Sequence, residues 1–419
     1  MYFERTEIQN FKGIEKMNLE FSSGVNLLIG NNGVGKTTVL EALALSIQTY
    51  FSRMNDIAKK SIKKDDVHFT SNLVGDASQH RVYSNPTVIK SEINLGGLEY
   101  SSEISREDET NATRTKYTGK EFAGRDLLNS QEAILPVICY FSTSRVVDTQ
   151  KVSTNAVGKN KLNDRRCGYI DCLNATLDRK ALTDWTFKMA MAEYKKGTAV
   201  AEYEAFKKAV GIFMQKMNDL EEIPLVEYTR DFEDITYAED GKTMLVNYLS
   251  AGYQSLLWML MEISFRIALL NPELSDYSQA EGIVLIDEID MHLHPRWQWK
   301  ILDALHSSFP KVQFIAATHS PIIISSFKDA KLLSIGENGV EELSGAYAYS
   351  IDDVVEYKQG SFGIPQELRR LKQEFEDAFC LRDRENSQKA VDKMKELFGT
   401  SNTEVKRAEA KMQMRKNWN

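Results

Sequence analysis

The sequence predicts an α/β fold in which a mostly parallel core sheet is flanked by an antiparallel sheet. Three observations support this prediction. A glycine-rich loop separates an apolar run from a helix-like segment within residues 25–47. Two further apolar runs, residues 283–286 and 312–317, each lead into polar residues, as buried strands of parallel sheets do. Residues 88–105 instead alternate in polarity around a Gly-Gly pair, which is typical of an antiparallel hairpin.

The composition is that of an ordinary soluble globular protein, with 42% hydrophobic and 27% charged residues. Its 419 residues suffice for roughly two to three domains. The net charge of −8 argues against a protein that coats nucleic acid along its whole surface. The chain has no apolar run long enough to span a membrane and no signal-peptide layout. Four cysteines do not suggest a disulfide framework, so we expect a cytoplasmic protein without a membrane partner.

The glycine-rich loop fits a phosphate-binding pattern, Gly-x-x-x-x-Gly-Lys-Thr, at every position. A strand before such a loop and a helix after it aim backbone N–H groups at phosphates. We therefore expect ATP and Mg²⁺ as ligands, with Lys36 reaching the β- and γ-phosphates and the Thr37 hydroxyl on the metal. The predicted nucleotide-binding residues here are Gly30, Asn31, Asn32, Gly33, Val34, Gly35, Lys36, Thr37 and Thr38.

A downstream acidic strand end, Ile-Val-Leu-Ile-Asp-Glu at residues 283–288, complements this loop. Mg²⁺ usually takes one or two carboxylates and keeps several waters, so Asp287 is expected to hold it through water. Glu288 has no structural task at a strand exit, but it is suited to orient and deprotonate an attacking water. His319 follows the apolar run 312–317, at the rim where open α/β sheets bind ligands, and is predicted to contact the γ-phosphate.

The segment Leu249-Ser-Ala-Gly-Tyr253, called here the signature segment, precedes a stretch that is apolar nearly all round and is typical of a buried helix. Taken alone, it could be a simple helix cap. Ser250 and Gly252 would also offer N–H groups, a hydroxyl and a positive helix end to an anion. Because the phosphate loop already has its own helix, a second anion-binding helix start suggests a nucleotide held by a second copy.

In this order, the motifs resemble those of the ABC-type ATPase clan, which includes SMC proteins, RecF and the OLD-like ATPases. The His294-Pro295 ending of the acidic motif, "ATHSP" at 317–321 and the opening "IQNFKGIEKMNLEF" resemble the RecF/OLD-like branch. The resemblance covers about residues 2–145 and 245–345. It implies that two copies enclose two ATP molecules, each between one copy's P-loop and the other's Ser250 and Gly252. It also implies a position near the nucleotide for Lys12.

The chain departs from the clan's pattern at two points. Ala251 replaces a glycine of the signature, which is a mild change. No glutamine follows the predicted strand Leu135–Phe141, which leaves Ser142 and Arg145 as candidates for sensing the γ-phosphate.

We expect an ABC/SMC-type ATPase head in two lobes, residues 1–145 and 246–345, with a mainly helical insertion at 146–245 and a helical tail at 346–419. The segments expected within these parts are an exposed loop at 106–130, helices at 182–194 and 200–220, a strand pair at 225–229 and 244–249, two tail helices and a frayed basic end.

The compact insertion and the tail resemble the stand-alone PtuA-type ATPases of Septu and retron-linked anti-phage systems, whose partner is a separate HNH nuclease. This implies an ATP-hydrolysing homodimer or higher homo-oligomer that controls a nuclease effector and has no nuclease site of its own. DNA or RNA is a further candidate partner. The alternative is a RecF/SMC-like repair or recombination ATPase that clamps duplex DNA, for which short basic clusters at 59–64 and 159–166 are candidates. Glu288 argues against a scaffold that holds ATP without turnover.

Overall fold

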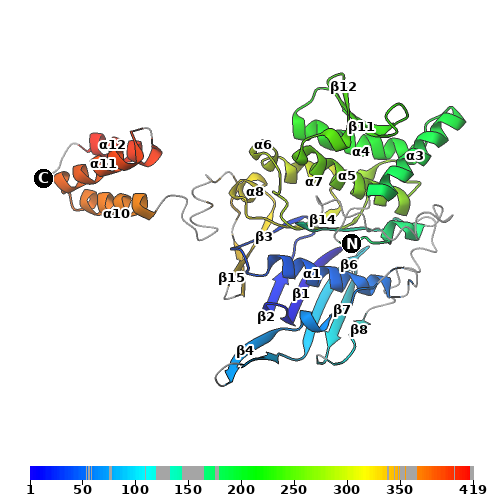
Figure 1. The fold of residues 1–419 in the computed structure, drawn as a ribbon, viewed down its shortest axis with the longest axis horizontal. Helices are drawn as coiled ribbons and strands as arrows, with labels where there is room; N and C mark the ends of the chain where they lie inside the picture. Colours follow the sequence, from blue (N-terminus) through cyan, green and yellow to red (C-terminus); the bar gives the residue numbers. More distant parts are fainter. Residues whose placement is uncertain are drawn as a thin grey trace. The chain divides into compact units, whose positions relative to one another are not determined.

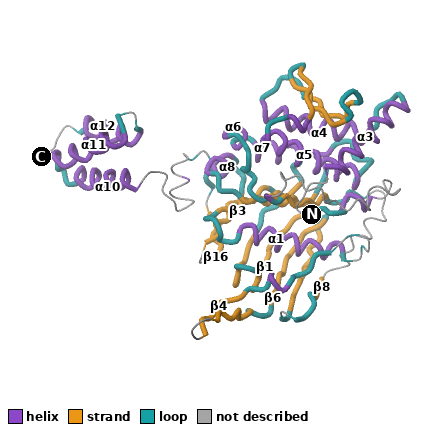
Figure 2. Tube along the Cα trace, viewed as in Figure 1, coloured by secondary structure: helices purple, strands orange, loops and turns teal. Residues whose placement is uncertain are grey.

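The computed structural model describes residues 1–52, 54, 57, 59–74, 78–108, 110–118, 133–143, 165–174, 179–336, 339–343, 345–347, 349, 354, 366–400 and 402–415. The chain divides into two compact units, Met1–Tyr349 and Ser350–Asn419. Figures 1 and 2 show the elements of each unit. Among the described residues, no helix combines the length and apolar character that crossing a bilayer requires.

The core sheet of the first unit has the strand order β16-β15-β3-β14-β13-β9. Its strands are β3 (Val25–Ile29), β9 (Val137–Phe141), β13 (Gly282–Ile286), β14 (Val312–Ala317), β15 (Lys331–Gly336) and β16 (Gly339–Leu343). All neighbours are parallel except β15 and β16. Every residue of β3, β9, β13 and β14 is buried, as strands covered on both faces must be. The parallel register brings the ends of β3, β13 and β14 to one edge.

An antiparallel sheet of order β2-β1-β6-β7-β8 flanks the core, as expected. It contains β1 (Tyr2–Phe11), β2 (Ile14–Glu20), β6 (Thr87–Leu95), β7 (Leu98–Arg106) and β8 (Arg114–Thr118). The predicted hairpin around Gly96 and Gly97 is β6–β7. The expectation of a loop throughout 106–130 was wrong for β8, a polar strand that forms by pairing with β7. A separate ribbon joins β4 (Phe69–Val74) to β5 (Ser78–Tyr83).

Helix α1 (Lys36–Ile47) contacts β1 and β6 of the flanking sheet and β13 and β14 of the core sheet. The Ser46 hydroxyl, buried in this layer, lies 2.8 Å from the Ser102 hydroxyl of β7. Figure 1 shows α1 and the other helices of this unit on opposite faces of the core sheet. Short 3₁₀ turns lie at η1 (Gln48–Phe51) and η2 (Lys64–Asp66).

The opposite face carries α3 (Arg179–Lys196), α4 (Ala201–Asn218), α5 (Ala251–Leu270), α6 (Pro295–Gln298), α7 (Ile301–Ser308), α8 (Pro321–Ser326) and η6 (Tyr277–Gln279). Helix α5 is buried along nearly its whole length, as its apolar sequence predicted. The expected strand pair 225–229 and 244–249 was incomplete. β10 (Leu225–Thr229) pairs with β11 (Asp234–Glu239), which pairs with β12 (Lys242–Leu245). Residues Val246–Tyr248 form a 3₁₀ turn, η5.

Residues 165–174, which begin with η4 (Arg165–Tyr169), are fixed to three elements. The Tyr169 hydroxyl lies 3.2 Å from that of Tyr50, just after α1. The carbonyl of Cys172 accepts the backbone N–H of Tyr140 in β9 at 3.0 Å. Arg266 of α5, paired with Glu262, donates to the carbonyls of residues 168 and 170 at 2.8 and 2.9 Å. This segment therefore ties α1, the edge strand and α5 together.

The second unit is formed by α10 (Gln366–Cys380), α11 (Arg384–Phe398) and α12 (Thr403–Met414). The buried residues that form its core are Leu368, Leu371, Phe375, Ala390, Val391, Met394, Val405 and Ala408. The expectation of a frayed basic end was wrong for α12. Asn402 caps it by accepting the N–H groups of residues 404 and 405, and Val405 and Ala408 bury its inner face.

Candidate nucleotide site

The predicted P-loop lies between β3 and α1 and has a backbone that requires glycine. Gly30 has φ +140°, and a Cβ on it would lie 2.3 Å from the carbonyl oxygen of Ile335 in β15. Gly35, the residue before α1, has φ +104°. L-residues avoid these conformations, so the loop can turn this tightly only with glycine at both positions. The loop's backbone is thereby brought to the carboxyl edge of the core sheet.

Lys36, the first residue of α1, reaches back across this loop. Its Nζ donates hydrogen bonds of 2.9 Å to the carbonyls of Gly30 and Asn31. Only 7% of the residue is exposed. Burial lowers the pKa of Lys36, and the carboxylates of Asp287, Glu288 and Asp290 oppose that shift. The ammonium group is thus held in place at the loop, beside three acids.

The two predicted metal-holding residues are in direct contact. The Thr37 hydroxyl donates a 2.8 Å hydrogen bond to Oδ2 of Asp287, which follows β13. Asp287 is 3% exposed, and its own N–H donates to the carbonyl of Phe141 at 2.7 Å. A hydroxyl and a carboxylate are hard oxygen donors of the kind that Mg²⁺ selects together with waters and phosphate oxygens. The donor set therefore fits the predicted ion.

Glu288 begins a segment with unusual backbone geometry. Glu288 has φ +45° and His292 has φ +64°, the left-handed region in which a non-glycine residue costs about 1 kcal/mol. Between them, Asp290 accepts a 2.5 Å hydrogen bond from the Thr318 hydroxyl, and Ile289 donates to the carbonyl of Ala317 at 3.0 Å. These bonds to the end of β14 hold the left-handed turn and fix the point at which Glu288 leaves the sheet.

His319 lies in the same electrostatic environment. Burial and the positive charge of Lys36 lower the pKa of His319, and the carboxylates of Asp290, Glu288 and Asp287 oppose the shift. This shift favours the neutral imidazole. The adjacent Ser320 caps α8 by accepting the N–H of residue 323 at 3.3 Å, and its hydroxyl donates to Gln298 at 2.6 Å. The structure thus groups Lys36, Thr37, Asp287, Glu288 and His319 at one edge of the core sheet.

The signature segment lies at a different place. Ser250 is the exposed N-cap residue of α5 and makes no side-chain capping bond. Gly252 is buried, and a Cβ on it would lie 2.7 Å from the carbonyl oxygen of His292. A hollow of about 600 Å³ opens here, lined by Asn218, Ser250, Ala251, Gly252, Tyr253, His292, His294, Arg296 and Trp297. This lining includes no P-loop residue.

Lys12, in the turn between β1 and β2, is engaged by acids. Its ammonium group forms an ion pair of 2.5 Å with Glu41 of α1 and one of 3.6 Å with Asp66. The structure therefore places Lys12 against the helix that follows the P-loop. Of the two residues considered for the missing glutamine, Ser142 directly follows β9 and is half-buried, whereas Arg145 lies outside the described residues.

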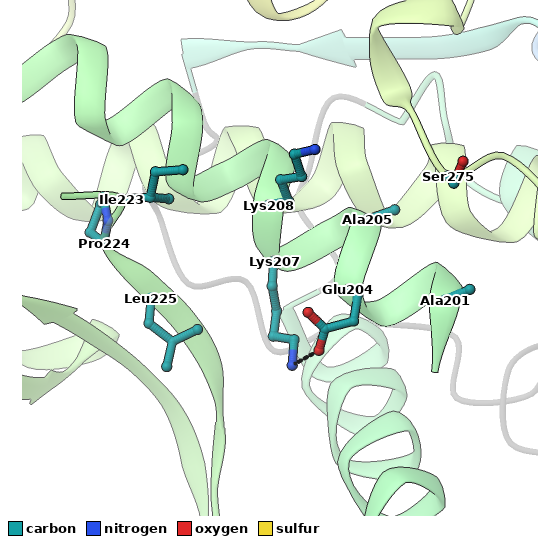
Figure 3. A pocket seen from close by; sticks show the side chains of 9 residues that line it. All are labelled: Ala201, Glu204, Ala205, Lys207, Lys208, Ile223, Pro224, Leu225 and Ser275. Atoms are coloured by element: carbon teal, nitrogen blue, oxygen red, sulfur yellow. Dashed lines mark ion pairs between the residues drawn. The ribbon is translucent and has the colours of Figure 1, made fainter. Parts of the chain in front are cut away.

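A second hollow, of about 450 Å³, lies on the insertion and contains none of the predicted site residues. Figure 3 shows its lining, Ala201, Glu204, Ala205, Lys207, Lys208, Ile223, Pro224, Leu225 and Ser275, with the ion pair between Lys207 and Glu204. Sequence analysis also missed three residues beside the signature segment, Asn218, Glu239 and Trp297. They belong to no sequence motif. The only hint in the sequence is the pair of tryptophans in "RWQW" at residues 296–299.

Several known proteins resemble this chain in sequence or in fold. A family model described as an AAA domain matches residues 5–235, and one described as an AAA ATPase domain matches residues 149–324. The chain is 25% identical to the Septu protein PtuA of Bacillus mycoides (strain KBAB4) over 98% of its own length and 53% of that protein's. It is 23% identical to the Retron Vc95 probable ATPase of Vibrio cholerae serotype O1 biovar El Tor, over 79% of this chain and 72% of that one.

The chain thus spans about half the length of the first of these relatives. Among solved structures, it resembles the SMC head bound to the C-winged helix domain of ScpA, with a TM-score of 0.51 and 17% identity, over 82% of this chain and 98% of that one. This likeness concerns the fold. The family model that matches residues 5–235 shows that the chain belongs to the AAA-domain family; its fold resembles that of an SMC head, and its sequence resembles that of the Septu protein PtuA.

Proposed function

We propose that this chain binds ATP and Mg²⁺, hydrolyses ATP between two copies of itself, and thereby controls a separate nuclease in an anti-phage defence complex. The observation that carries the catalytic part is the hydrogen bond between Thr37 and Asp287, which joins the P-loop to the acidic strand end. Lys36 and Glu288 lie at the same edge of the sheet. These are the groups that phosphoryl transfer to water requires.

Each residue has a distinct role in this proposal. Lys36 exchanges its two loop carbonyls for β- and γ-phosphate oxygens, and the N–H groups of residues 30–38 hold the remaining phosphate charge. Thr37 and Asp287 would hold Mg²⁺, which would supply positive charge to neutralise that of the phosphates. Glu288 orients the water and takes its proton. His319, whose lowered pKa favours the neutral imidazole, is a hydrogen-bond partner for the γ-phosphate.

The second copy enters the proposal because of where Ser250 lies. Ser250 and Gly252 line a hollow that contains no P-loop residue, yet they combine an exposed hydroxyl with the start of a 20-residue helix. A second copy's nucleotide would complete this half-site, with the helix end favouring its phosphate charge. The active form is then a homodimer or a larger assembly of dimers.

The nuclease partner is proposed from the relatives. The Septu protein PtuA matches nearly the whole chain, and the retron ATPase matches four fifths of it. The resemblance to PtuA-type ATPases implies a separate HNH nuclease as the partner, with DNA or RNA as the nucleic acid that it cuts. The insertion at 146–245 and the C-terminal helices are the candidate docking elements.

The experiment is native mass spectrometry of the complex purified from its own operon, with and without ATP. We expect a small nuclease at a fixed ratio to the ATPase, and nuclease activity that depends on nucleotide. A particle without a nuclease that pairs only with ATP and binds duplex DNA, with an affinity that falls steeply with salt, would instead support a RecF/SMC-like clamp. Ser250→Arg tests the dimer separately, because it should block ATP-driven pairing and leave nucleotide binding by the single chain intact.

A further inference from the structure

One carboxylate oxygen of the insertion accepts hydrogen bonds from α4, β11 and the first turn of α5. Oε2 of Glu239, at the end of β11, accepts the Tyr237 hydroxyl, the Asn218 amide at 3.0 Å and the Tyr253 hydroxyl at 3.5 Å. Tyr253 is in the first turn of α5, directly after Gly252. We call Asn218, Tyr237, Glu239, Tyr253 and Trp297 the signature clamp. It joins the insertion to the start of α5.

Asn218, the last residue of α4, bridges the clamp with both ends of its amide. Its Oδ1 accepts the indole N–H of Trp297 at 3.0 Å, and its Nδ2 donates to the Tyr253 hydroxyl at 3.1 Å. An indole N–H can only donate, so the amide oxygen must face Trp297 and the NH₂ must face Tyr253. The next residue, Asp219, pairs with Arg296 at 2.7 Å, which holds the end of α4 to α6 a second time.

Ring packing makes the clamp rigid. The rings of Tyr253 and Trp297 meet edge to face with centroids 4.6 Å apart, and Tyr237 lies 5.9 Å from Tyr253. Burial and the charge of Glu239 raise the pKa of Tyr237 and Tyr253, so both phenols remain donors at neutral pH. Edge-to-face pairs and buried polar networks favour a single arrangement over many similar ones.

The signature clamp contacts Gly252 of the signature segment through Trp297. A Cβ on Gly252 would lie 3.3 Å from Cζ3 of Trp297 and 2.7 Å from the His292 carbonyl oxygen. The first turn of α5 is thus confined by its contacts with the clamp and with the backbone that follows Glu288. Ser250 adds no capping bond of its own, so its orientation depends on this confinement.

We propose that Asn218 and Glu239 are positioning residues for ATP hydrolysis: through Tyr253 and Trp297 they orient Ser250 and Gly252 toward the nucleotide of a second copy. This proposal rests on the function proposed above, in which that half-site completes the ATPase. It assigns the insertion a role in turnover, because Asn218 and Glu239 both belong to it. A partner that displaces the end of α4 would change the orientation of the signature segment.

The test measures kcat, KM, nucleotide affinity of the single chain and Tm in the full-length protein. We expect Asn218→Ala to lower kcat by about tenfold, because hydrogen bonds to Tyr253 and Trp297 are lost together, while P-loop affinity changes less than about twofold. Glu239→Ala should behave in the same way. Glu239→Gln should keep most of the activity, because an amide oxygen still accepts from Tyr237 and Asn218. The double variant Asn218→Ala/Tyr253→Phe should be little worse than Asn218→Ala, since both remove one network.

Asn247→Ala is the matched control. It removes an asparagine of η5, bonded to Asp234 of β11 at 3.2 Å and outside the clamp, and it should leave kcat unchanged. Unchanged kcat in Asn218→Ala, or an equal loss in Asn247→Ala that follows Tm, would overturn the proposal. Ser250→Arg distinguishes failure of the positioning role from failure of the function proposed above. If Ser250→Arg abolishes turnover and Asn218→Ala does not, only the positioning role is wrong. Normal turnover in Ser250→Arg would overturn both proposals.

Discussion

Thr37 and Asp287 are joined by a 2.8 Å hydrogen bond although 250 positions separate them in the chain. One follows β3 and the other follows β13, and parallel pairing through β14 brings these two strand ends to one edge. The bond therefore reports that the P-loop and the acidic strand end form one site. Thr37 and Asp287 are also the two residues that would hold a magnesium ion in this site.

Asp287→Asn should separate metal binding from folding. The amide oxygen of the substituted side chain would still accept the Thr37 hydroxyl, so we expect little change in Tm. Loss of the carboxylate should weaken Mg²⁺-dependent turnover by roughly 10- to 100-fold, as for other outer-shell metal partners. The measurement is ATPase rate against Mg²⁺ concentration. A variant whose Mg²⁺ dependence matched that of the wild type would remove Asp287 from the metal site.

Glu288→Gln should abolish hydrolysis and retain ATP binding. Glutamine has a side chain of the same length as glutamate and should adopt the left-handed backbone of residue 288 at a similar cost. It cannot, however, take a proton from water. Loss of a general base typically costs about 10² to 10⁴ in rate. We expect ATP to trap a dimer, which light scattering after size-exclusion chromatography would detect. Normal hydrolysis by this variant would mean that another residue is the base.

Gly252→Ala tests the contact between the signature segment and the backbone after Glu288. The added methyl would lie 2.7 Å from the His292 carbonyl oxygen, so one of the two segments must move. Overpacking of this kind costs about 1–3 kcal/mol, and we expect both a lower Tm and a lower kcat. Gly13→Ala is the control, because a Cβ on Gly13 meets nothing within 4 Å. Equal effects of the two substitutions would exclude a specific role for the contact.

The lowered pKa of His319 should make the stability of the fold fall at acidic pH. Its pKa in the folded protein lies below the ordinary value of 6.5, so in the interval between the two values the unfolded chain binds a proton that the folded chain does not. Its contribution to stability is therefore complete above pH 6.5 and is lost as the pH falls toward the folded pKa. Denaturant titrations from pH 5 to 8, at about half-unit steps, should show this loss in the wild type and less of it in His319→Asn.

The contribution of Lys36 to the lowered pKa of His319 can be tested separately. Lys36→Met removes the charge that, after burial, contributes most to lowering the pKa of His319. The pKa of His319, followed by the NMR shift of its ring proton in nucleotide-free protein, should rise in this variant. An unchanged value would mean that Lys36 and His319 are not neighbours in solution.

Much of the site could be predicted because its residues are tied to local patterns. Glycines at fixed spacing, an apolar strand with acids after it and a histidine after the next strand each carry their own signal. The parallel sheet that brings them together follows from the same strands. The fold class was confirmed for this reason, down to the hairpin of β6 and β7.

The remaining features have no local signal. Strand β8 is polar and exists through its pairing with β7, and α12 buries only Val405 and Ala408, too few for a clear apolar period. The signature clamp is a stronger case. Asn218, Glu239 and Trp297 are far apart in sequence, and an asparagine at a helix end or a glutamate in a hairpin has many ordinary explanations. Only the tertiary arrangement makes them neighbours.

The segment 165–174 links α1, the helix that follows the P-loop, to α5, the helix that begins in the signature segment. It is bonded to η1, which directly follows α1, through Tyr169, to β9 through Cys172 and to α5 through Arg266. In a two-copy assembly, α1 and α5 of one chain would serve different nucleotides. A movement of α5 at one ATP would then be transmitted through residues 165–174 to α1, which lies at the other ATP. The two ATP molecules would therefore be hydrolysed in correlated rather than independent events.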